Sequence, residues 1–244
     1  MTNVIETTPP PAAQAREASS VRSLLGAVVR LLTFRMTREE FAGLDRRHLA
    51  VGVVCTWLVG VGRWWDDPGA NLLQLLGVGS VVYIFVLAGL LWVVVRPLKP
   101  RDWTYRHVLT FVSLTSPPAI LYAIPVERFT SLATARSLNV WFLATVAAWR
   151  VALLLFYLRR HARLSVFAIG VASLLPLTAV VVTLTALNLE RAVFDLMGGL
   201  RETGGTANDG AYAVLVTLTM LSMLLFAPLL VCYVFLAAWA RMRK

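Results

Sequence analysis

Long apolar runs, separated by short polar segments, make up most of the chain after residue 47. Their lengths suit a bilayer, which a helix crosses in about 17 to 25 residues. The pattern predicts a membrane domain over 48–240, with spans near 48–65, 72–95, 108–124, 138–158, 164–187 and 211–240. The first run is the shortest, so it crosses only if Arg46 and Arg47 snorkel at one end and Trp65 lies at the opposite interface. We therefore expect an all-α bundle of about six transmembrane helices.

The chain before these runs has a different pattern. Residues 1–18 are polar and rich in proline, which predicts a disordered tail. Residues 19–47 form a cytoplasmic segment in which apolar residues recur at helical spacing with arginines between them. This pattern predicts an N-terminal amphipathic helix at the membrane interface, or alternatively a short helix packed on the ends of the spans. Thr37 and Glu40 fit a capping box, which predicts a further helix running into the first span.

Composition supports the membrane class. Hydrophobic residues make up 58% of the chain and charged residues 15%, with a mean hydropathy of +0.72. A water-soluble domain carries roughly 25% charged residues. Cys55 and Cys232 lie within apolar runs without metal-ligand spacing, so no metal or cofactor is expected.

The basic residues are distributed unevenly between the polar segments. With the N-terminus inside, seventeen lie on the cytoplasmic side, including the basic tail 241–244, and five lie outside. Because arginine and lysine accumulate on the cytoplasmic side, this split predicts that both termini are cytoplasmic. The pI of 10.6 then reflects orientation rather than nucleic-acid binding. Arginine outnumbers lysine twenty-one to two, which favours a GC-rich bacterial source and thus the bacterial inner membrane.

Several residues at the predicted cytoplasmic boundary are suited to lipid contact. We expect anionic headgroups to be bound by Arg22, Arg30, Arg46, Arg47, Arg159 and Arg160. The three histidines, His48, His107 and His161, lie beside arginines at predicted helix ends, which favours lipid contact over metal binding.

The apolar runs lack the residues that proton-coupled transport or hydrolysis would need. The apolar runs contain no Asp or Glu, which disfavours proton-coupled transport. They also lack G-x-S-x-G and H-E-x-x-H, so no residue is predicted to be catalytic.

Arg150 is the one ionisable group predicted to lie well inside a span. It precedes the end of its run at Leu158 by eight residues, which is about 12 Å of helix. An intramembrane charge is a functional-site hypothesis by default, although a structural role is the alternative. Its expected partners are polar groups near Ser116, Ser173 or Asn188, or a lipid phosphate.

Pro117 and Pro118 interrupt the third span directly after Ser116. Proline lacks a backbone donor, so the carbonyls of Ser113 and Leu114 should lose their helical partners. This pattern predicts a broken-helix binding site, or alternatively a kink that shapes the bundle. The segment 188–197 keeps helical spacing outside the membrane, which predicts an interfacial extension of the fifth span rather than a substrate lid.

The order of these features resembles the Yip1-domain family. The resemblance covers about residues 30–185 and rests on the hairpin of two spans, the sequence 105–109 leading into Ser116-Pro117-Pro118, and a tryptophan-containing span that ends in a basic turn. It implies a non-enzymatic membrane protein that acts through partners, lipids or membrane shape. Yip1-like proteins usually have five spans, so the sixth run departs from the pattern.

Three functions are compatible with these observations. The leading hypothesis is a non-catalytic scaffold, assembly or membrane-organising factor that contacts anionic lipids and other membrane proteins or further copies of itself. The alternative is a small transporter or channel subunit that uses Arg150 and the Pro117-Pro118 break. A lipid-modifying enzyme is the third hypothesis.

Overall fold

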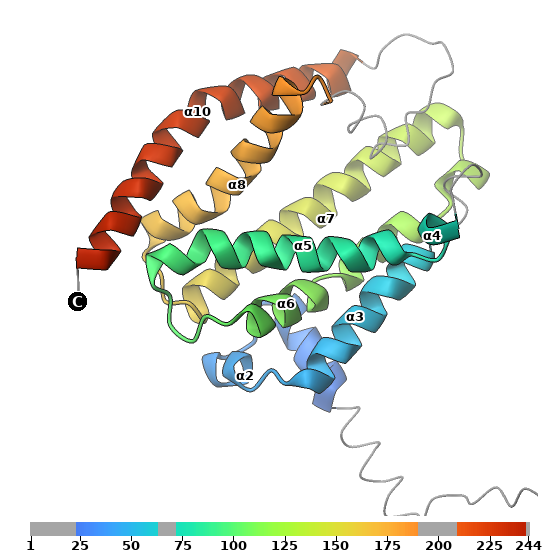
Figure 1. The fold of residues 1–244 in the computed structure, drawn as a ribbon. Helices are drawn as coiled ribbons and strands as arrows, with labels where there is room; N and C mark the ends of the chain where they lie inside the picture. Colours follow the sequence, from blue (N-terminus) through green and yellow to red (C-terminus); the bar gives the residue numbers. More distant parts are fainter. Residues whose placement is uncertain (1–22, 63–71, 190–208, 243–244) are drawn as a thin grey trace, which may run out of the picture.

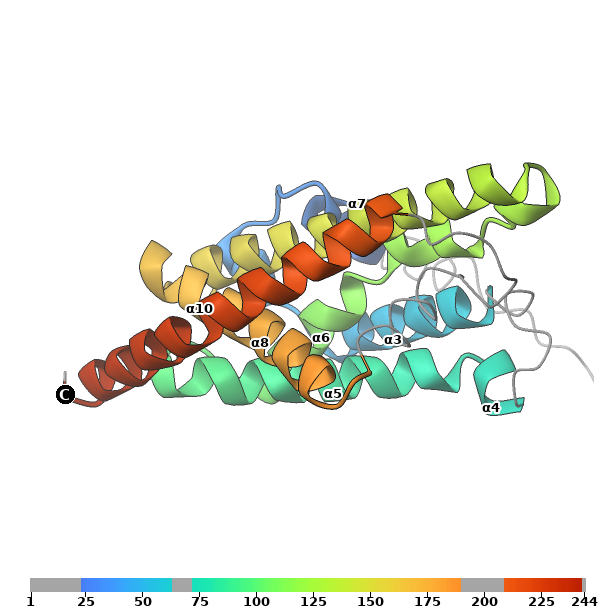
Figure 2. The same ribbon diagram turned by 90° about the horizontal axis from the view of Figure 1, so that it is seen from above.

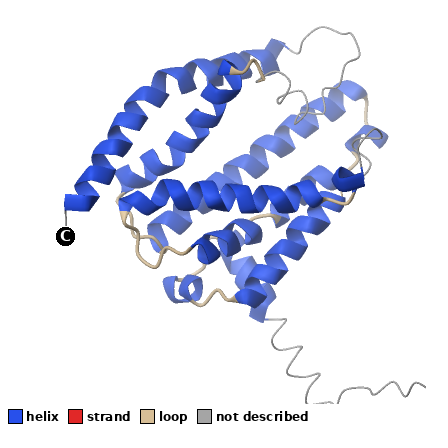
Figure 3. Cartoon of the chain, viewed as in Figure 1, coloured by secondary structure: helices blue, strands red, loops and turns tan. Residues whose placement is uncertain are grey.

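The computed structural model describes residues 23–62, 72–189 and 209–242. These residues form helices and loops without strands (Figure 3). The predicted tail 1–18, Arg22 and the outer segment from residue 190 to 208 lie outside the described residues. The elements in chain order are a helix at Ser23–Leu32, α2 (Arg38–Ala42), α3 (Arg46–Val61), α4 (Leu72–Leu75), α5 (Val78–Val95), η1 (Arg96–Leu98), α6 (Tyr105–Leu114), η2 (Pro117–Ala123), η3 (Val126–Arg128), α7 (Leu132–Arg160), α8 (Val166–Ala186) and α10 (Asp209–Met242).

Four described helices are long and apolar enough to cross a membrane. They cover Val78–Leu98, Ser137–Arg160, Val166–Ala186 and Val216–Met242. A fifth crossing is possible if α6 and the segment Pro117–Arg128, which meet at 42°, form one bent span. The chain therefore has the character of a multi-pass membrane protein.

Two predicted spans differ from the helices in the structure. The predicted first span corresponds to α3, whose 16 residues extend about 24 Å and fall short of a hydrocarbon core of about 30 Å. The predicted second span is divided at Gly77, whose left-handed φ of +67° separates α4 from α5. A Cβ at Gly77 would lie 2.8 Å from the backbone nitrogen of Val61, so the turn fits closely against the end of α3. The expected count of six spans is thus not confirmed.

Side-chain caps determine where several helices begin. The Thr37 hydroxyl accepts from the Glu40 amide at 3.3 Å, while the Thr37 amide donates to the Glu40 carboxylate at 2.8 Å, which confirms the predicted capping box. The resulting helix, α2, ends at Ala42 and does not run into the first span as expected. A second cap explains the break, because the Asp45 carboxylate accepts the amide of Arg47 at 2.9 Å and starts α3.

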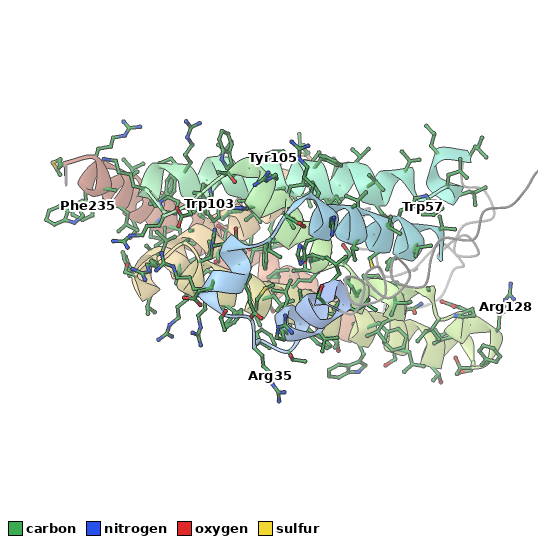
Figure 4. The ribbon with its side chains drawn as sticks, turned by 90° about the horizontal axis from the view of Figure 1, so that it is seen from below. Arg35, Trp57, Trp103, Tyr105, Arg128 and Phe235 are labelled. Carbon is green, nitrogen blue, oxygen red and sulfur yellow. The ribbon has the colours of Figure 1, made fainter. Side chains whose placement is uncertain are left out.

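The helices form one packed group and one lateral pair. In Figure 2, α3 and α6 lie between α5 and α7. Helices α8 and α10 run side by side along one edge, and α10 makes most of its contacts with α8 (Figure 1). Helices α5, α7 and α10 all end at the same end of the bundle (Figure 1), which we call the basic end because Arg96, Arg159, Arg160 and Arg241 lie at these helix ends. Figure 4 shows Trp103 and Phe235 near this end, and Trp57 and Arg128 near the opposite end.

The helix Ser23–Leu32 packs into the core. Ala27, Val28 and Leu31 are buried against α5, α6 and α7, and the Trp149 indole donates to the Leu32 carbonyl at 3.0 Å. Trp149 lies eleven residues before Arg160, the last residue of α7, and thus about 16 Å along the helix from the basic end. One face of the helix is thus packed, but against the side of α7 rather than on the ends of the spans as the second alternative had it. Leu25 and Val29 of the same helix stay exposed, so the predicted interfacial helix is not confirmed.

Candidate functional site at the basic end of the bundle

Four arginines from two distant parts of the chain surround one hollow at the basic end. The last turn of α7 supplies Arg159 and Arg160, and the following loop supplies Arg163 in a left-handed conformation with a φ of +54°. Arg38 reaches the hollow from the first turn of α2. The hollow has a volume of about 590 Å³, and Phe156 forms its apolar wall. We call this feature the arginine hollow.

The charges of the arginine hollow are only weakly compensated by the protein. The Arg38 guanidinium lies 3.9 Å from the Asp102 carboxylate, at the outer limit of an ion pair. Within the part of the chain that the structure describes, Arg159, Arg160 and Arg163 form no ion pair. The Arg160 guanidinium lies 5.8 Å from the centre of the Phe156 ring, where a cation–π attraction is still favourable. The carbonyls at the C-terminus of α7 also favour positive charge. A bound anion would remove the remaining repulsion, and the planar guanidinium suits phosphate oxygens.

A stack of rings supports the arginine hollow from inside. Tyr157 lies parallel to Phe111, with ring centroids 4.1 Å apart, and stacks on His161 at 5.1 Å. Phe41 meets the Tyr157 ring edge-on at 5.2 Å, so α2 is anchored to α7 beside the hollow. The Tyr157 side chain is 1% exposed, and its hydroxyl has no hydrogen-bond partner among the described residues.

His161 is buried, which contradicts the expectation of lipid contact. Its Nε2 lies 3.3 Å from the Asp102 carbonyl oxygen, and Nδ1 of His107 lies 3.3 Å from the same oxygen. Burial lowers the pKa of His161, and the neighbouring His107 lowers it further. The rings of His107 and His161 therefore help to position the loop that contains Asp102. The third histidine, His48, belongs to the N-terminal cap of α3 together with Asp45. Among the described residues, no group of three metal-binding side chains gathers.

Of the arginines expected at lipid headgroups, two line the arginine hollow. These two are Arg159 and Arg160. The Arg30 guanidinium instead forms an ion pair with the Glu40 carboxylate, at 2.7 Å. Arg46 and Arg47 are exposed in the first turn of α3, outside the hollow. The basic turn after α7 was visible in the sequence. The contribution of Arg38 was not, because no local pattern connects α2 with α7.

Arg150 lies against a different residue from those expected. Its guanidinium carbon is 5.9 Å from the centre of the Tyr83 ring on α5. Asn188 is exposed beyond α8 in a left-handed conformation, and Ser116 bonds to another hydroxyl. The Ser173 hydroxyl is buried without a hydrogen-bond partner in the described structure. A cation–π contact between two helices is consistent with a structural role for Arg150.

The predicted helix break after Ser116 is confirmed, and its polar groups bond to neighbouring groups. The Thr56 hydroxyl donates to the Gly52 carbonyl at 2.8 Å, and the Ser116 hydroxyl lies 2.7 Å from the Thr56 oxygen. The Ser113 carbonyl, which loses its helical partner, accepts the Ser116 amide at 3.2 Å and lies 3.5 Å from the Thr56 hydroxyl. These bonds favour the kink interpretation of Pro117 and Pro118. Pro176 and Pro228 lie inside continuous helices.

A stripe of small residues on α3 makes this close approach possible. Gly52, Thr56 and Gly60 are buried and are spaced by four, so they share one face of the helix. A Cβ at Gly52 would overlap the Ser113 hydroxyl, and one at Gly60 would lie 2.7 Å from the Ser80 hydroxyl. The sequence interpretation missed this stripe, although small residues spaced by four are a known feature of packed membrane helices.

Comparisons of the chain with models of protein families, with curated proteins and with solved structures give no match. The fold and the site therefore define the class alone: an all-helical, multi-pass membrane protein with an arginine-lined hollow at one end. The resemblance to Yip1-domain proteins stays a prediction.

Proposed function

We propose that the protein is a non-catalytic membrane-organising factor that binds anionic lipid headgroups at its basic end. The arginine hollow carries this proposal, because it gathers four guanidinium groups against one apolar wall. A basic side chain near an anionic membrane surface contributes about 1 kcal/mol of attraction. Such a protein would gather anionic lipids around itself and act as a scaffold for other membrane proteins or further copies of itself.

The proposal includes an orientation of the bundle. The basic end would face the cytoplasm, both termini would lie there, and the predicted first span at 48–65 would supply a sixth crossing of the bacterial inner membrane. The uneven distribution of basic residues supports this orientation. Helices α5, α7 and α10 end at the same end of the bundle, which is consistent with this orientation (Figure 1).

Reporter fusions test the orientation. A fusion in the segment containing Gly204 and Gly205 should be active only as an extracytoplasmic reporter, and a fusion after Lys244 only as a cytoplasmic one. Paired reporters, one active on each side of the membrane, provide the control at every position. A cytoplasmic signal from the Gly204-Gly205 segment would contradict the six-span topology.

Removing charge from the arginine hollow should weaken the binding of anionic lipid. We expect Arg159→Gln with Arg160→Gln to lower the affinity of the arginine hollow for phosphatidylglycerol about thirtyfold, since each charge contributes about 1 kcal/mol. Binding of zwitterionic phosphatidylcholine should not change. Native mass spectrometry of the full-length protein in detergent, titrated with each lipid, measures both affinities.

The matched control removes the same charge from the same end of the bundle. Arg46→Gln with Arg47→Gln neutralises two exposed arginines that do not line the arginine hollow and cannot share one phosphate with Arg38 and Arg163, so its effect on binding at the hollow should be several times smaller. An equal loss in both double variants would show that general surface charge, and not the hollow, attracts the lipid.

A further inference from the structure

A groove separates α5 from the pair formed by α8 and α10. Figure 1 shows α5 and α8 close together at the basic end and diverging toward the opposite end. The groove between them has a volume of about 500 Å³, and its lining is almost entirely apolar. Leu90 and Val94 form one wall, Leu175, Pro176 and Ala179 the second, and Leu230 the third.

A second hollow opens at the basic end of the same three helices. Its volume is about 320 Å³, and Lys99, Arg101 and Arg163 line it together with Leu98 and Leu236. None of these three basic residues forms an ion pair with another residue of the described segments. We call this feature the basic mouth, and its position is distinct from that of the arginine hollow although Arg163 borders both.

The basic mouth and the apolar groove follow each other along the same faces of the helices. Leu90, Val94 and Leu98 recur every fourth residue, from the groove to the mouth. On α8, Ala168 lines the mouth and Ala179 lines the groove, about 16 Å further along the helix. This length matches one leaflet of a hydrocarbon core about 30 Å thick.

Tyr233 marks the boundary between the two parts. Its ring packs against the buried cluster around Val95 and Leu98, and its hydroxyl donates to the Val94 carbonyl at 2.8 Å. The hydrogen bond connects α10 to α5 near the basic mouth, and the helices diverge from there toward the opposite end. We call the basic mouth and the apolar groove together the seam.

We propose that this seam binds one anionic glycerophospholipid of the surrounding bilayer. The phosphate would lie at Lys99, Arg101 and Arg163, and one acyl chain would run over the half-buried Tyr233 ring, outside its hydrogen bond to α5, into the groove. The separation of charge at one end and apolar surface along the rest matches the two parts of a phospholipid. A free phosphate would use only the mouth, and a partner helix would leave the three charges unpaired. The inference goes beyond the proposed function, because it assigns a site for a single lipid between helices.

Photo-crosslinking tests the site. The full-length protein is reconstituted into nanodiscs that contain phosphatidylglycerol with a diazirine near the end of one acyl chain. After irradiation, the crosslinked peptides are mapped by mass spectrometry. Crosslinks should concentrate at 175–184 on α8 and 226–230 on α10. Lys99→Gln with Arg101→Gln should reduce lipid binding at this site about thirtyfold. Millimolar inorganic phosphate should not displace the lipid.

Groove-filling variants separate this site from the arginine hollow. Ala179→Phe should abolish the crosslinks by filling the groove, whereas Leu177→Phe, on an exposed face of α8 outside the groove, should leave them unchanged. Arg159→Gln with Arg160→Gln should also leave the crosslinks unchanged. The proposal that the arginine hollow binds lipid and the proposal that the seam binds lipid can therefore be rejected independently. Three results would overturn the proposal. The crosslinks could be spread evenly over exposed helix faces, they could persist in a folded Ala179→Phe protein, or phosphate could displace the lipid.

Discussion

Replacing Tyr157 with alanine should destabilise the protein by about 3–5 kcal/mol, the usual cost of removing a large buried aromatic side chain. Tyr157 is 1% exposed, and its ring contacts Phe111 and His161 by stacking and Phe41 by its edge. Alanine would leave a cavity at the point where α2, α6 and α7 meet, and the ring that contacts all three would be lost. The midpoint of unfolding in mixed SDS and mild-detergent micelles measures the loss.

Two further variants make the Tyr157 prediction specific. Tyr157→Phe keeps every ring contact and removes a buried hydroxyl without a hydrogen-bond partner among the described residues, so it should stabilise the protein by about 1 kcal/mol. Trp141→Ala removes a large aromatic side chain from the same helix at a position that is 68% exposed, and it should change stability little. Lower stability in Tyr157→Phe would show that the hydroxyl is hydrogen-bonded in the folded protein.

The second large effect is expected at Gly52. Leucine at this position should destabilise the protein by about 3 kcal/mol, because α3 and α6 would have to separate. Its Cβ alone would overlap the Ser113 hydroxyl and lie 3.0 Å from the backbone nitrogen of Leu114, which cannot rotate away. Separation would also break the bond between Thr56 and Ser116. The yield of monodisperse protein after extraction, together with the unfolding midpoint, measures the effect.

A glycine in open space provides the control. No atom lies within 4 Å of a Cβ built at Gly89 on α5. Gly89→Leu should therefore extract and unfold like the parent protein. If Gly52→Leu and Gly89→Leu behave alike, close packing at the stripe of small residues does not hold α3 against α6.

Helix positions were largely predictable from the chain, and the errors have physical causes. Apolar runs identify α5, α7, α8 and α10, because hydrophobicity is a property of each residue. The division of the second span at Gly77 was not predicted, because a left-handed turn needs only one glycine and leaves the apolar run unbroken. Asp45 caps α3 and thereby ends the expected continuous helix, but one aspartate in a polar segment is a weak local indication.

The candidate site was predictable only in part. Arg159 and Arg160 were expected at headgroups because a basic turn after a span is a local pattern. The contributions of Arg38 and Phe156 depend on α2 packing beside α7 through Phe41 and Tyr157. That contact joins residues far apart in the chain.

By itself, the sequence determined the membrane class and the location of most helices, since both depend on local apolar length and composition. Tertiary structure decided which polar groups meet: Arg150 with Tyr83, Ser116 with Thr56, and the arginines around one hollow. The physical reason is that lipid tails are as apolar as leucine, so hydrophobicity does not select one helix neighbour over another. Shape, small residues and hydrogen bonds make that selection, and these depend on the complete three-dimensional arrangement.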